Sequence, residues 1–395
     1  MPNSRDALIT GIGLISCLGE GVDAHWSALT SPDGLQPILE TDVHPGFAVH
    51  PMTALALDTQ IPKRDQRQME AWQRIGVYAA GLALDSAGVK GNTDLLNRME
   101  MIVAAGGGER DYAVDTQILS ALPKAADPGA YLNEHLLSDI RPTLFLAQLS
   151  NLLAGNISLV HGVIGSSRTF MGEEAAGTDA LRIAVNRIHS GQGELALVGG
   201  SYNAQRPDIL LHYEMGGKLW RKPFEGVWSR QAGGGGMIPG SLGCFLVVES
   251  RAHATARGAK VLARIGAVET DRCRREPGQA TANATRQLAK VAPDLDRATA
   301  AVLSGASGVA EATREERAFL DGLGLPVRGM ATAMGHGMEP AFIAHVALAA
   351  AAVARGRLFN PLDPVETAMD GPLRHVLVTS WGQWRGEAMA LVTGA

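Results

Sequence analysis

The stretch that decides the fold is "RTFMGEEAAGTDALRIAVNRIHSGQGELALVGG", residues 168–200. Its pattern predicts a strand, a sharp turn, an amphipathic helix and a second, buried strand. Many enzymes mount a nucleophile at such a turn, because the start of a helix is positive and its backbone N–H groups are free. Here the turn carries two adjacent carboxylates, Glu173 and Glu174, where a Ser or Cys would make chemical sense.

Strands and helices alternate on both sides of this stretch. Before it, the sequence predicts a short strand at 8–10, a turn-rich segment marked by Gly11, Gly13 and Gly19, and a helix carrying Val22, Trp26 and Leu29. The remaining elements of the first half are a helix at 68–88, a strand with a glycine loop at 99–111 and a helix at 144–162. The second half predicts strand 259–270, helix 278–295, strand 298–308, helix 338–356 and two strands within 373–394.

The two runs of elements follow the same order, which suggests an internal duplication. We therefore expect an α/β fold with an N-terminal half at 1–250, including loop and cap insertions, and a C-terminal half at 251–395. The helices are rich in Ala and Gly, which fits burial between sheets. An ordinary α/β protein without duplication is the alternative.

Composition excludes several classes of function. The chain has 395 residues, of which 46% are apolar and 19% charged, with a net charge of −5. That balance argues against nucleic acid or an anionic membrane as a general partner. Cys17, Cys244 and Cys273 show no disulfide or metal-ligand spacing. The run at 342–356 is too short for a membrane span and contains His345. We expect a soluble, cytoplasmic protein with no cofactor or metal.

Three longer stretches of the sequence resemble the motifs of a known protein family. "ALITGIGLISCLGEGVDAHWSAL" at 7–29, "GCFLVVESRAHATARGAKVLARI" at 243–265 and "MGHGMEPAFIAHVALAAAAVARGRLFNP" at 334–361 resemble the β-ketoacyl-ACP synthases. These are the condensing enzymes of fatty-acid and polyketide biosynthesis, and the resemblance covers essentially the whole chain in the family's order. It implies the thiolase fold, in which two duplicated α/β halves form αβαβα layers, usually within a two-fold dimer.

The family's chemistry uses three side chains. A Cys at a helix N-terminus carries the acyl chain as a thioester, and the positive helix end favours its thiolate. Two His residues promote decarboxylation of malonyl-ACP and stabilise the enolate. Backbone N–H groups at the same turn form an oxyanion hole.

When the family's motifs are matched to this sequence, most of the family's catalytic positions fall on other residue types. The Cys position in "GEEAAG" falls on Glu174, and the first His position in "VLSGASG" falls on Ser304. The second His position in "MGHGMEP" is kept as His336, whereas the family's Lys five residues earlier falls on Ala331. The glycine-rich gating loop becomes "GQWRG" at 382–386.

A carboxylate cannot form the family's thioester, and a Ser cannot act as an imidazole. Decarboxylase variants of the family replace Cys with Gln but keep both His residues. The chain looks more like the chain-length-factor subunits, which lack the Cys and pair with an active synthase, although those usually carry Gln at this position. The first hypothesis is therefore a non-catalytic partner that dimerises with an active synthase. The alternatives are an altered condensing or decarboxylating enzyme that uses Glu174 and His336, and an acyl or acyl-ACP binding protein.

Two roles for Glu174 follow. As a structural residue, its carboxylate lies against the helix N-terminus and the former oxyanion-hole donors and pairs with His336. As a general base, it has a pKa raised toward neutrality by desolvation. Adjacent turn residues point in different directions, so only one of Glu173 and Glu174 should enter the pocket.

Further candidates surround this site. Acyl carrier protein docking favours a basic patch near the pocket mouth. The candidate residues for that patch are Arg206, Lys218, Arg221 and Lys222. Four tryptophans either narrow an acyl tunnel or are ordinary core residues. They are Trp220, Trp228, Trp381 and Trp384.

Overall fold

The computed structural model describes residues 3–140, 144 and 148–395, and it is a mixed α/β fold as the sequence predicts. The strands are β1 (Ala7–Ser16), β2 (Gly19–Glu20), β3 (Glu100–Ala104), β4 (Ser167–Phe170), β5 (Leu195–Tyr202), β6 (Leu242–Ser250), β7 (Ala263–Asp271), β8 (Ala300–Ser304), β9 (Val327–Gly329), β10 (His375–Ser380) and β11 (Glu387–Thr393).

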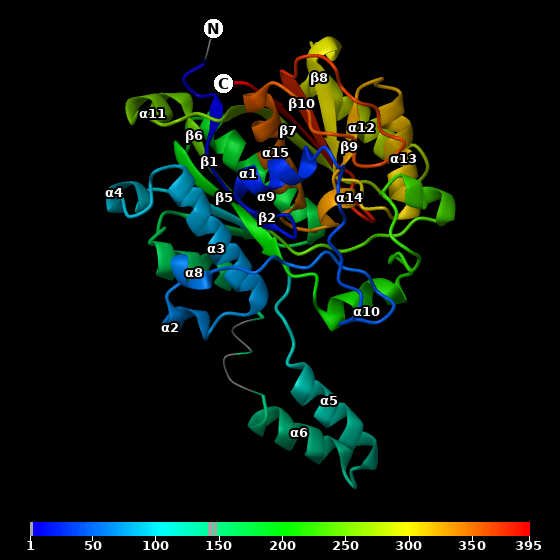
Figure 1. Ribbon diagram of the computed structural model, residues 1–395. Coiled ribbons are helices and arrows are strands. Elements are labelled where there is room, and N and C mark those ends of the chain that lie inside the picture. The colour runs from blue at the N-terminus through cyan, green and yellow to red at the C-terminus, as the bar shows by residue number, and fades with distance from the viewer. Residues whose placement is uncertain (1–2, 141–143, 145–147) are drawn as a thin grey trace.

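The helices bracket these strands on both faces (Figure 1). They are α1 (Gly21–Leu29), α2 (Lys63–Gln66), α3 (Ala71–Ser86), α4 (Thr93–Leu96), α5 (Tyr112–Ala121), α6 (Pro128–Ser138), α8 (Leu152–His161), α9 (Glu173–His189), α10 (Pro207–Met215), α11 (Arg251–Ala256), α12 (Gln279–Val291), α13 (Ala310–Asp321), α14 (Ala331–Met334) and α15 (Ala341–Arg355). Short 3₁₀ turns are η1 (Leu57–Thr59), η2 (Leu122–Lys124), η3 (Ser229–Gly233) and η4 (Arg297–Thr299).

The strand order makes the duplication visible. Across the sheet the order is β4-β3-β5-β6-β1-β7-β11-β10-β8-β9, with β2 paired to β1. From one edge to the centre, the first half runs β4-β3-β5-β6-β1. From the other edge to the centre, the second half runs β9-β8-β10-β11-β7. Numbered along the chain within its own half, each series is third, second, fourth, fifth and first. The halves meet through a short antiparallel pairing of Ala7, Leu8 and Ile9 with Ile265, Arg264 and Ala263. We propose to divide the chain after Ser250, where β6 ends the first repeat.

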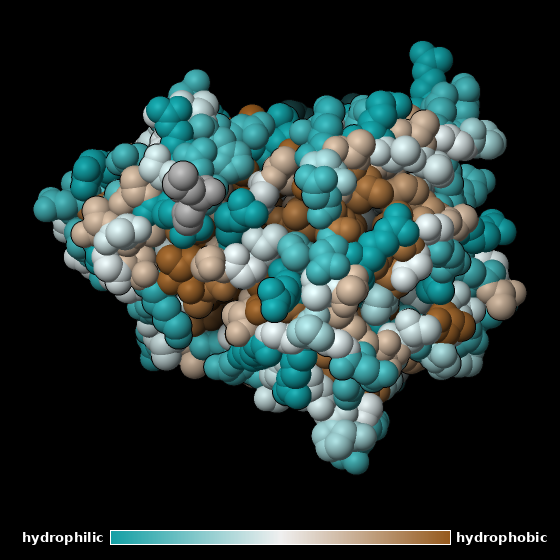
Figure 2. Space-filling view, turned by 90° about the horizontal axis from the view of Figure 1, so that it is seen from above, coloured by the Kyte–Doolittle hydropathy of each residue, from teal (hydrophilic) through white to brown (hydrophobic). Residues whose placement is uncertain are grey.

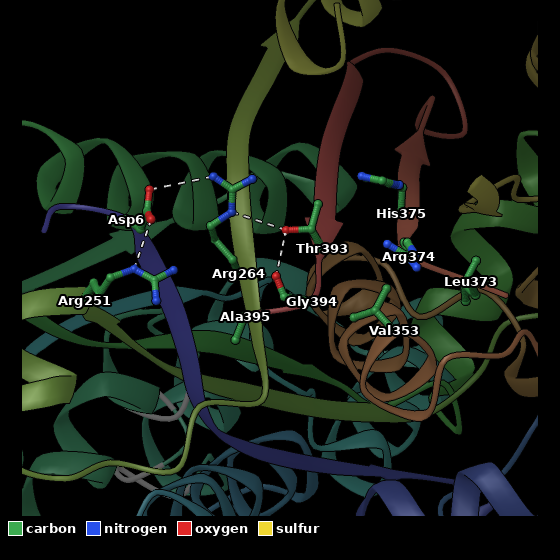
Figure 3. A pocket seen from close by; sticks show the side chains of 10 residues that line it. All are labelled: Asp6, Arg251, Arg264, Val353, Leu373, Arg374, His375, Thr393, Gly394 and Ala395. Atoms are coloured by element: carbon green, nitrogen blue, oxygen red, sulfur yellow. Dashed lines mark hydrogen bonds and ion pairs between the residues drawn. The ribbon is translucent and has the colours of Figure 1, made fainter. Parts of the chain in front are cut away.

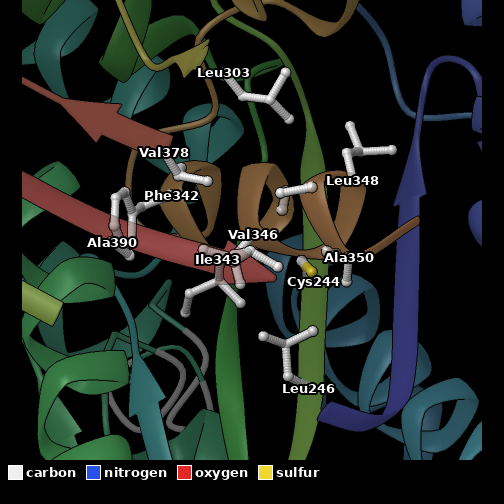
Figure 4. Close-up of a cluster of buried hydrophobic side chains, with 14 of the residues drawn as sticks. Cys244, Leu246, Leu303, Phe342, Ile343, Val346, Leu348, Ala350, Val378 and Ala390 are labelled. Carbon is white, nitrogen blue, oxygen red and sulfur yellow. The ribbon is translucent and has the colours of Figure 1, made fainter. Parts of the chain in front are cut away.

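Helices α9 and α15 form the middle layer. α9 packs on β3 and β5 of its own half and also on β7, while α15 packs on β10, β11 and, across the molecule, on β6. Figure 4 shows the side chains of α15 lying between residues of β6 on one side and of β8, β10 and β11 on the other. α3 covers the outer face of β1, β5 and β6, and α12 covers the outer face of β7 and β11. This is the layered αβαβα arrangement.

The first strand is longer than predicted. β1 runs through Gly11 and Gly13 to Ser16, so these glycines are strand residues and not turn residues. The reason is close packing, because a Cβ on Gly13 would lie 1.9 Å from the carbonyl oxygen of Ala79, and one on Gly11 would lie 2.4 Å from that of Ala83. Both carbonyls belong to α3, which therefore sits directly on the strand.

The structure also differs from the prediction at other helices. The helix expected at 144–162 is interrupted: Leu144 is helical, residues 148–151 are not, and α8 runs from Leu152, whereas residues 145–147 lie outside the described part of the chain. Helices α5 and α6 were not predicted, although Asp127 caps α6 by accepting the N–H of Ala130. They form a pair that extends away from the sheet in Figure 1.

No described helix is both long and apolar enough to cross a bilayer. The apolar run flagged in the sequence is the 15-residue α15, which is buried between the sheets. Seen from above the termini, the surface is hydrophilic over most of its area, with apolar side chains gathered in separate hollows (Figure 2).

Candidate active site

The turn before α9 keeps a strained geometry. β4 ends at Phe170, Gly172 has a φ of 118°, and Glu173 has a φ of 48°. A positive φ is uncommon for a residue with a Cβ and is typical of functional sites. One turn later, a Cβ on Gly177 would lie 2.0 Å from the carbonyl oxygen of Glu339. The turn is therefore strained and closely packed, and it carries two carboxylates.

Glu174 is the residue that enters the interior. It is only 2% exposed, and its Oε1 atom accepts a hydrogen bond of 2.6 Å from His336 Nε2. The same oxygen accepts a 2.7 Å hydrogen bond from the backbone N–H of Gln383. A carboxylate can only accept, so Nε2 of His336 carries the proton. The structure therefore joins the predicted Cys position and the predicted second His position in one buried pair.

The pKa of Glu174 is shifted downward. Burial raises the pKa of this carboxyl, but the hydrogen bond and charge of His336, with the N–H of Gln383, outweigh burial and hold the pKa below its ordinary value. The predicted general-base role required a raised pKa, so that part of the prediction is wrong. The reason is that the imidazole and an amide N–H contact the carboxylate directly and stabilise its charged form.

The backbone fixes His336 firmly. Its N–H donates to the carbonyl oxygen of Ile238 at 2.8 Å, and its own carbonyl accepts from the N–H of Gly240 at 3.0 Å. Gly335 precedes it with a φ of 70°, and a Cβ there would lie 2.7 Å from the nitrogen of Gly240. The imidazole is thereby presented toward α9 from the loop before α15.

Glu173 faces the outer side of the same turn. Its carboxylate accepts hydrogen bonds from Gln383 Nε2 at 2.9 Å, from the Tyr213 hydroxyl at 3.4 Å and from the indole N–H of Trp384. The two glutamates therefore bind the 382–386 loop from inside and outside. As predicted, only one of them enters the interior.

Ser304 stands apart from this pair. It ends β8, is fully buried, and donates a 2.8 Å hydrogen bond to Glu316 Oε1, which also accepts from Thr379 Oγ1 at 2.7 Å. No hydrogen bond joins Ser304 to Glu174 or His336 among the described residues. Burial raises the pKa of Glu316. At the predicted first His position, the hydroxyl of Ser304 thus binds the buried carboxyl of Glu316, a residue that carried no signal in the sequence.

The predicted docking patch is partly wrong. Arg206 is 6% exposed and is tied to Asp208 at 2.7 Å and to two backbone carbonyls, so it is not available at the surface. Lys218 lines an outer groove of about 520 Å³ together with Glu173, Tyr213 and Trp384. Arg221 and Lys222 are exposed next to it, although Arg221 pairs with Glu214 at 2.9 Å.

Among the four tryptophans only Trp384 lies at the site. Trp381 is 1% exposed and packs against Phe319 at a ring distance of 5.8 Å. Trp228 donates its indole N–H to Glu366, and Trp220 donates to the carbonyl of Pro223. These three are core residues.

A second pocket of about 630 Å³ lies far from the turn, at the start of β10 (Figure 3). It is lined by Arg251, Arg264 and Arg374, and the first two of these pair with Asp6. None of the predicted site residues reaches it, so it does not belong to the candidate site.

Together, the fold and the site define a class: an α/β protein with the duplicated layers and nucleophile turn of a condensing enzyme, but with a carboxylate at that turn. Residues 4–254 match the family model "Beta-ketoacyl synthase, N-terminal domain". Since this match spans more than half of the chain, the chain belongs to the β-ketoacyl synthase family.

Individual relatives are distant. The "Actinorhodin polyketide putative beta-ketoacyl synthase 2" of Streptomyces coelicolor is 28% identical over 260 residues, 64% of this chain and 60% of that protein. The chain spans only 60–63% of the length of these curated relatives. Solved structures that cover 99% of both chains include the following two. One is the ishigamide ketosynthase/chain length factor, at 19% identity and a TM-score of 0.77. The other is a type II polyketide acyl-carrier protein in complex with its ketosynthase, at 16% and 0.72. Both support the thiolase-type fold.

Proposed function

We propose that this protein is a non-catalytic, chain-length-factor-type subunit that pairs with an active β-ketoacyl-ACP synthase. The observation that carries the proposal is the Glu174 carboxylate, buried at the start of α9 and hydrogen-bonded to His336 at 2.6 Å. This carboxylate occupies the family's thiol position and engages the one imidazole that remains. A carboxylate at that position cannot form the family's thioester.

The sheet edge suggests where the partner binds. β4 ends the strand order and pairs only with β3, so its outer edge is unpaired among the described residues. Around it, Leu159 is 84%, Ile164 61% and Met171 66% exposed. An open edge strand with exposed apolar neighbours is costly in a monomer and is typical of an interface. This face therefore suits a subunit of the same fold.

Acyl carrier protein is the second partner we propose, at the outer groove beside Lys218. A family relationship supports it, as does the solved ketosynthase in complex with its acyl-carrier protein. Lys218 with the exposed Arg221 and Lys222 supplies positive charge for an acidic carrier.

Co-expression with a β-ketoacyl-ACP synthase of the same organism that keeps the Cys and both His residues tests the first proposal. We expect a 1:1 heterodimer in native mass spectrometry, and we expect Leu159→Arg to weaken it at least tenfold. The matched control is Val365→Arg, since Val365 is 51% exposed but lies in a loop before β10. A stable homodimer with no affinity for the synthase would contradict the proposal.

An active enzyme with altered chemistry is the second candidate, because Glu174 and His336 form a buried acid–base pair. Its test is incubation of the purified protein, alone and with the synthase, with malonyl-ACP and an acyl-ACP. Turnover by this chain alone that is abolished by Glu174→Gln would favour this candidate over the non-catalytic role. A covalently bound acyl group on the chain would exclude both.

A further inference from the structure

A small, partly open cavity lies behind the turn and plays no part in the proposal above. It has a volume of about 50 Å³ and lies where the ends of β3 and β5 meet the starts of α10 and α15. Trp72, Gly106, Tyr202, Arg206 and Glu339 are among its lining residues. The space accommodates a compact group or a few water-sized groups.

Two residues that line this cavity each hold a buried hydrogen-bond donor without a partner among the described residues. Trp72 is 2% exposed, and its indole N–H is unpaired. Tyr202 is 7% exposed, and its hydroxyl is unpaired. Burial raises the pKa of Tyr202, so the hydroxyl keeps its proton. Unpaired buried donors are rare in folded proteins, because each costs about 1–3 kcal/mol.

A carboxyl group lines the same cavity. Glu339 is 6% exposed, and its Oε1 atom would lie 2.7 Å from a Cβ on Gly106, so the carboxyl lies directly against that glycine. Burial and the charges of Glu174 and Glu173 raise the pKa of Glu339 to about 7. Apart from its own backbone N–H, this carboxyl has no hydrogen-bond partner among the described residues.

The remaining polar groups of the lining are already satisfied. Arg206 binds Asp208 and the carbonyls of Gly107 and Gly108. Asn203 donates to Glu109 at 3.0 Å. The free groups are therefore two neutral donors and one carboxyl. An alkyl group would leave all three unpaired, and an anion would meet the charges of the neighbouring glutamates.

We propose that this cavity is a binding site for a compact, neutral, oxygen-bearing group, such as a carboxamide, a keto group or a hydroxyl. An oxygen of the ligand accepts from the indole N–H of Trp72 and the hydroxyl of Tyr202, and a ligand O–H or N–H donates to Glu339. Such a group is either a free small molecule or the oxygenated end of a chain. The site requires no second subunit, so it stands apart from the proposed pairing with a synthase.

The first test is a titration of the full-length protein with acetamide, followed by the ¹⁵N–¹H resonance of the Trp72 indole. That resonance is assigned with Trp72→Phe. We expect a saturable shift in the millimolar range and about fivefold weaker binding in Tyr202→Phe, the loss of one neutral hydrogen bond. The matched control is the indole of Trp381, which is also buried and unpaired but lies outside the cavity. No saturable shift, an equal shift of Trp381, or unchanged binding in Tyr202→Phe would overturn the proposal.

Two further arms complete the test. Acetate, the charged isostere, should not bind at pH 8 but should bind severalfold better in Glu339→Gln, which keeps the shape of the side chain. Equal binding of acetate and acetamide by the parent protein would also count against the site, even where Tyr202→Phe does not fold. Finally, 3-hydroxybutanoyl-pantetheine and butanoyl-pantetheine are compared. A Trp72 shift with the hydroxylated chain alone identifies a chain end as the source, and a shift with acetamide alone identifies a free molecule.

Discussion

Glu174 and Glu316 are both almost completely buried, yet the pKa of the first carboxyl is lowered and that of the second is raised. Glu174 contacts an imidazole and a backbone N–H, whereas Glu316, within the described part of the chain, accepts from the hydroxyls of Ser304 and Thr379 alone. Burial acts on both in the same direction. The difference therefore comes from the partner, because a partner that can carry charge stabilises the carboxylate more than a neutral hydroxyl does.

The same comparison separates the two clusters that hold the predicted site residues. At the predicted second His position, His336 is hydrogen-bonded to the Glu174 carboxylate. At the predicted first His position, Ser304 is hydrogen-bonded to Glu316 and shares no hydrogen bond with that pair among the described residues. One position thus holds a buried carboxylate–imidazole hydrogen bond, and the other holds a carboxyl bound by two hydroxyls.

The largest expected effect comes from breaking the hydrogen bond between His336 and Glu174. His336→Ala strands the Glu174 carboxylate in the interior, and we expect it to lower the free energy of unfolding by roughly 3–5 kcal/mol. Urea denaturation measures this loss. Glu174→Ala in the same background should then cost less than in the parent, since the stranded charge is already unpaired.

The control for this prediction is His345→Ala. His345 is also buried, in α15, and burial lowers its pKa to about 3, so it is neutral. We expect a smaller loss than for His336→Ala, because no charge is stranded. Equal losses of unfolding free energy in the two variants would mean that His336 stabilises the protein through packing alone. The hydrogen bond between His336 and Glu174 would then contribute no measurable stability.

Glu174→Gln tests the sign of the pKa shift. The folded pKa lies below the unfolded value, so the carboxylate contributes stability above the unfolded pKa and loses it as the pH falls through the folded pKa. At pH 7 we expect Glu174→Gln to cost about 1–3 kcal/mol. The difference from the parent should shrink below about pH 4, where the unfolded carboxyl also binds a proton. A constant difference from pH 7 to pH 3 would contradict the lowered pKa.

The sequence predicted the members of this site better than their contacts. Spacing within "GEEAAG" and "MGHGMEP" identified Glu174 and His336, and the alternation of strands and helices identified the duplicated fold. Gln383 and Glu316 were missed, because a lone Gln in a loop and a Glu on a helix have no local pattern. Their roles arise from contacts across 209 residues for Gln383 and across 12 for Glu316.

The wrong predictions share that cause. The raised pKa of Glu174 followed from burial alone, and the contact that reversed it lies 162 residues away. The prediction of a turn at Gly11 and Gly13 is wrong, because a glycine in the sequence is equally compatible with a turn and with a close approach of α3 to β1. Arg206 was placed at the surface from its charge, although Asp208, two residues on, pairs with it.

Glu316→Gln should act in the opposite direction to Glu174→Gln. A raised folded pKa means that the parent loses stability as the pH rises from the unfolded pKa through the folded one. The amide oxygen of Gln can still accept from Ser304 and Thr379 but carries no charge to bury. We therefore expect Glu316→Gln to equal or exceed the parent in stability at pH 8, by up to about 1 kcal/mol. A loss of several kcal/mol at pH 8 that disappears at pH 4 would show that Glu316 is a charged residue like Glu174.

The smallest expected effect separates the inner glutamate from the outer one. Trp384 is 47% exposed and donates its indole N–H to Glu173, whereas Glu174 holds the same loop through the backbone N–H of Gln383. Trp384→Phe removes only the outer contact, and water can replace it at a half-exposed position. We expect a loss of about 0.5 kcal/mol in urea denaturation and no change in proteolysis of the 382–386 loop. A loss above about 2 kcal/mol, with faster cleavage of the loop, would mean that Glu173 and not Glu174 is the main anchor. The buried carboxylate would then hold His336 alone, and the loop would be free to move independently of the pair.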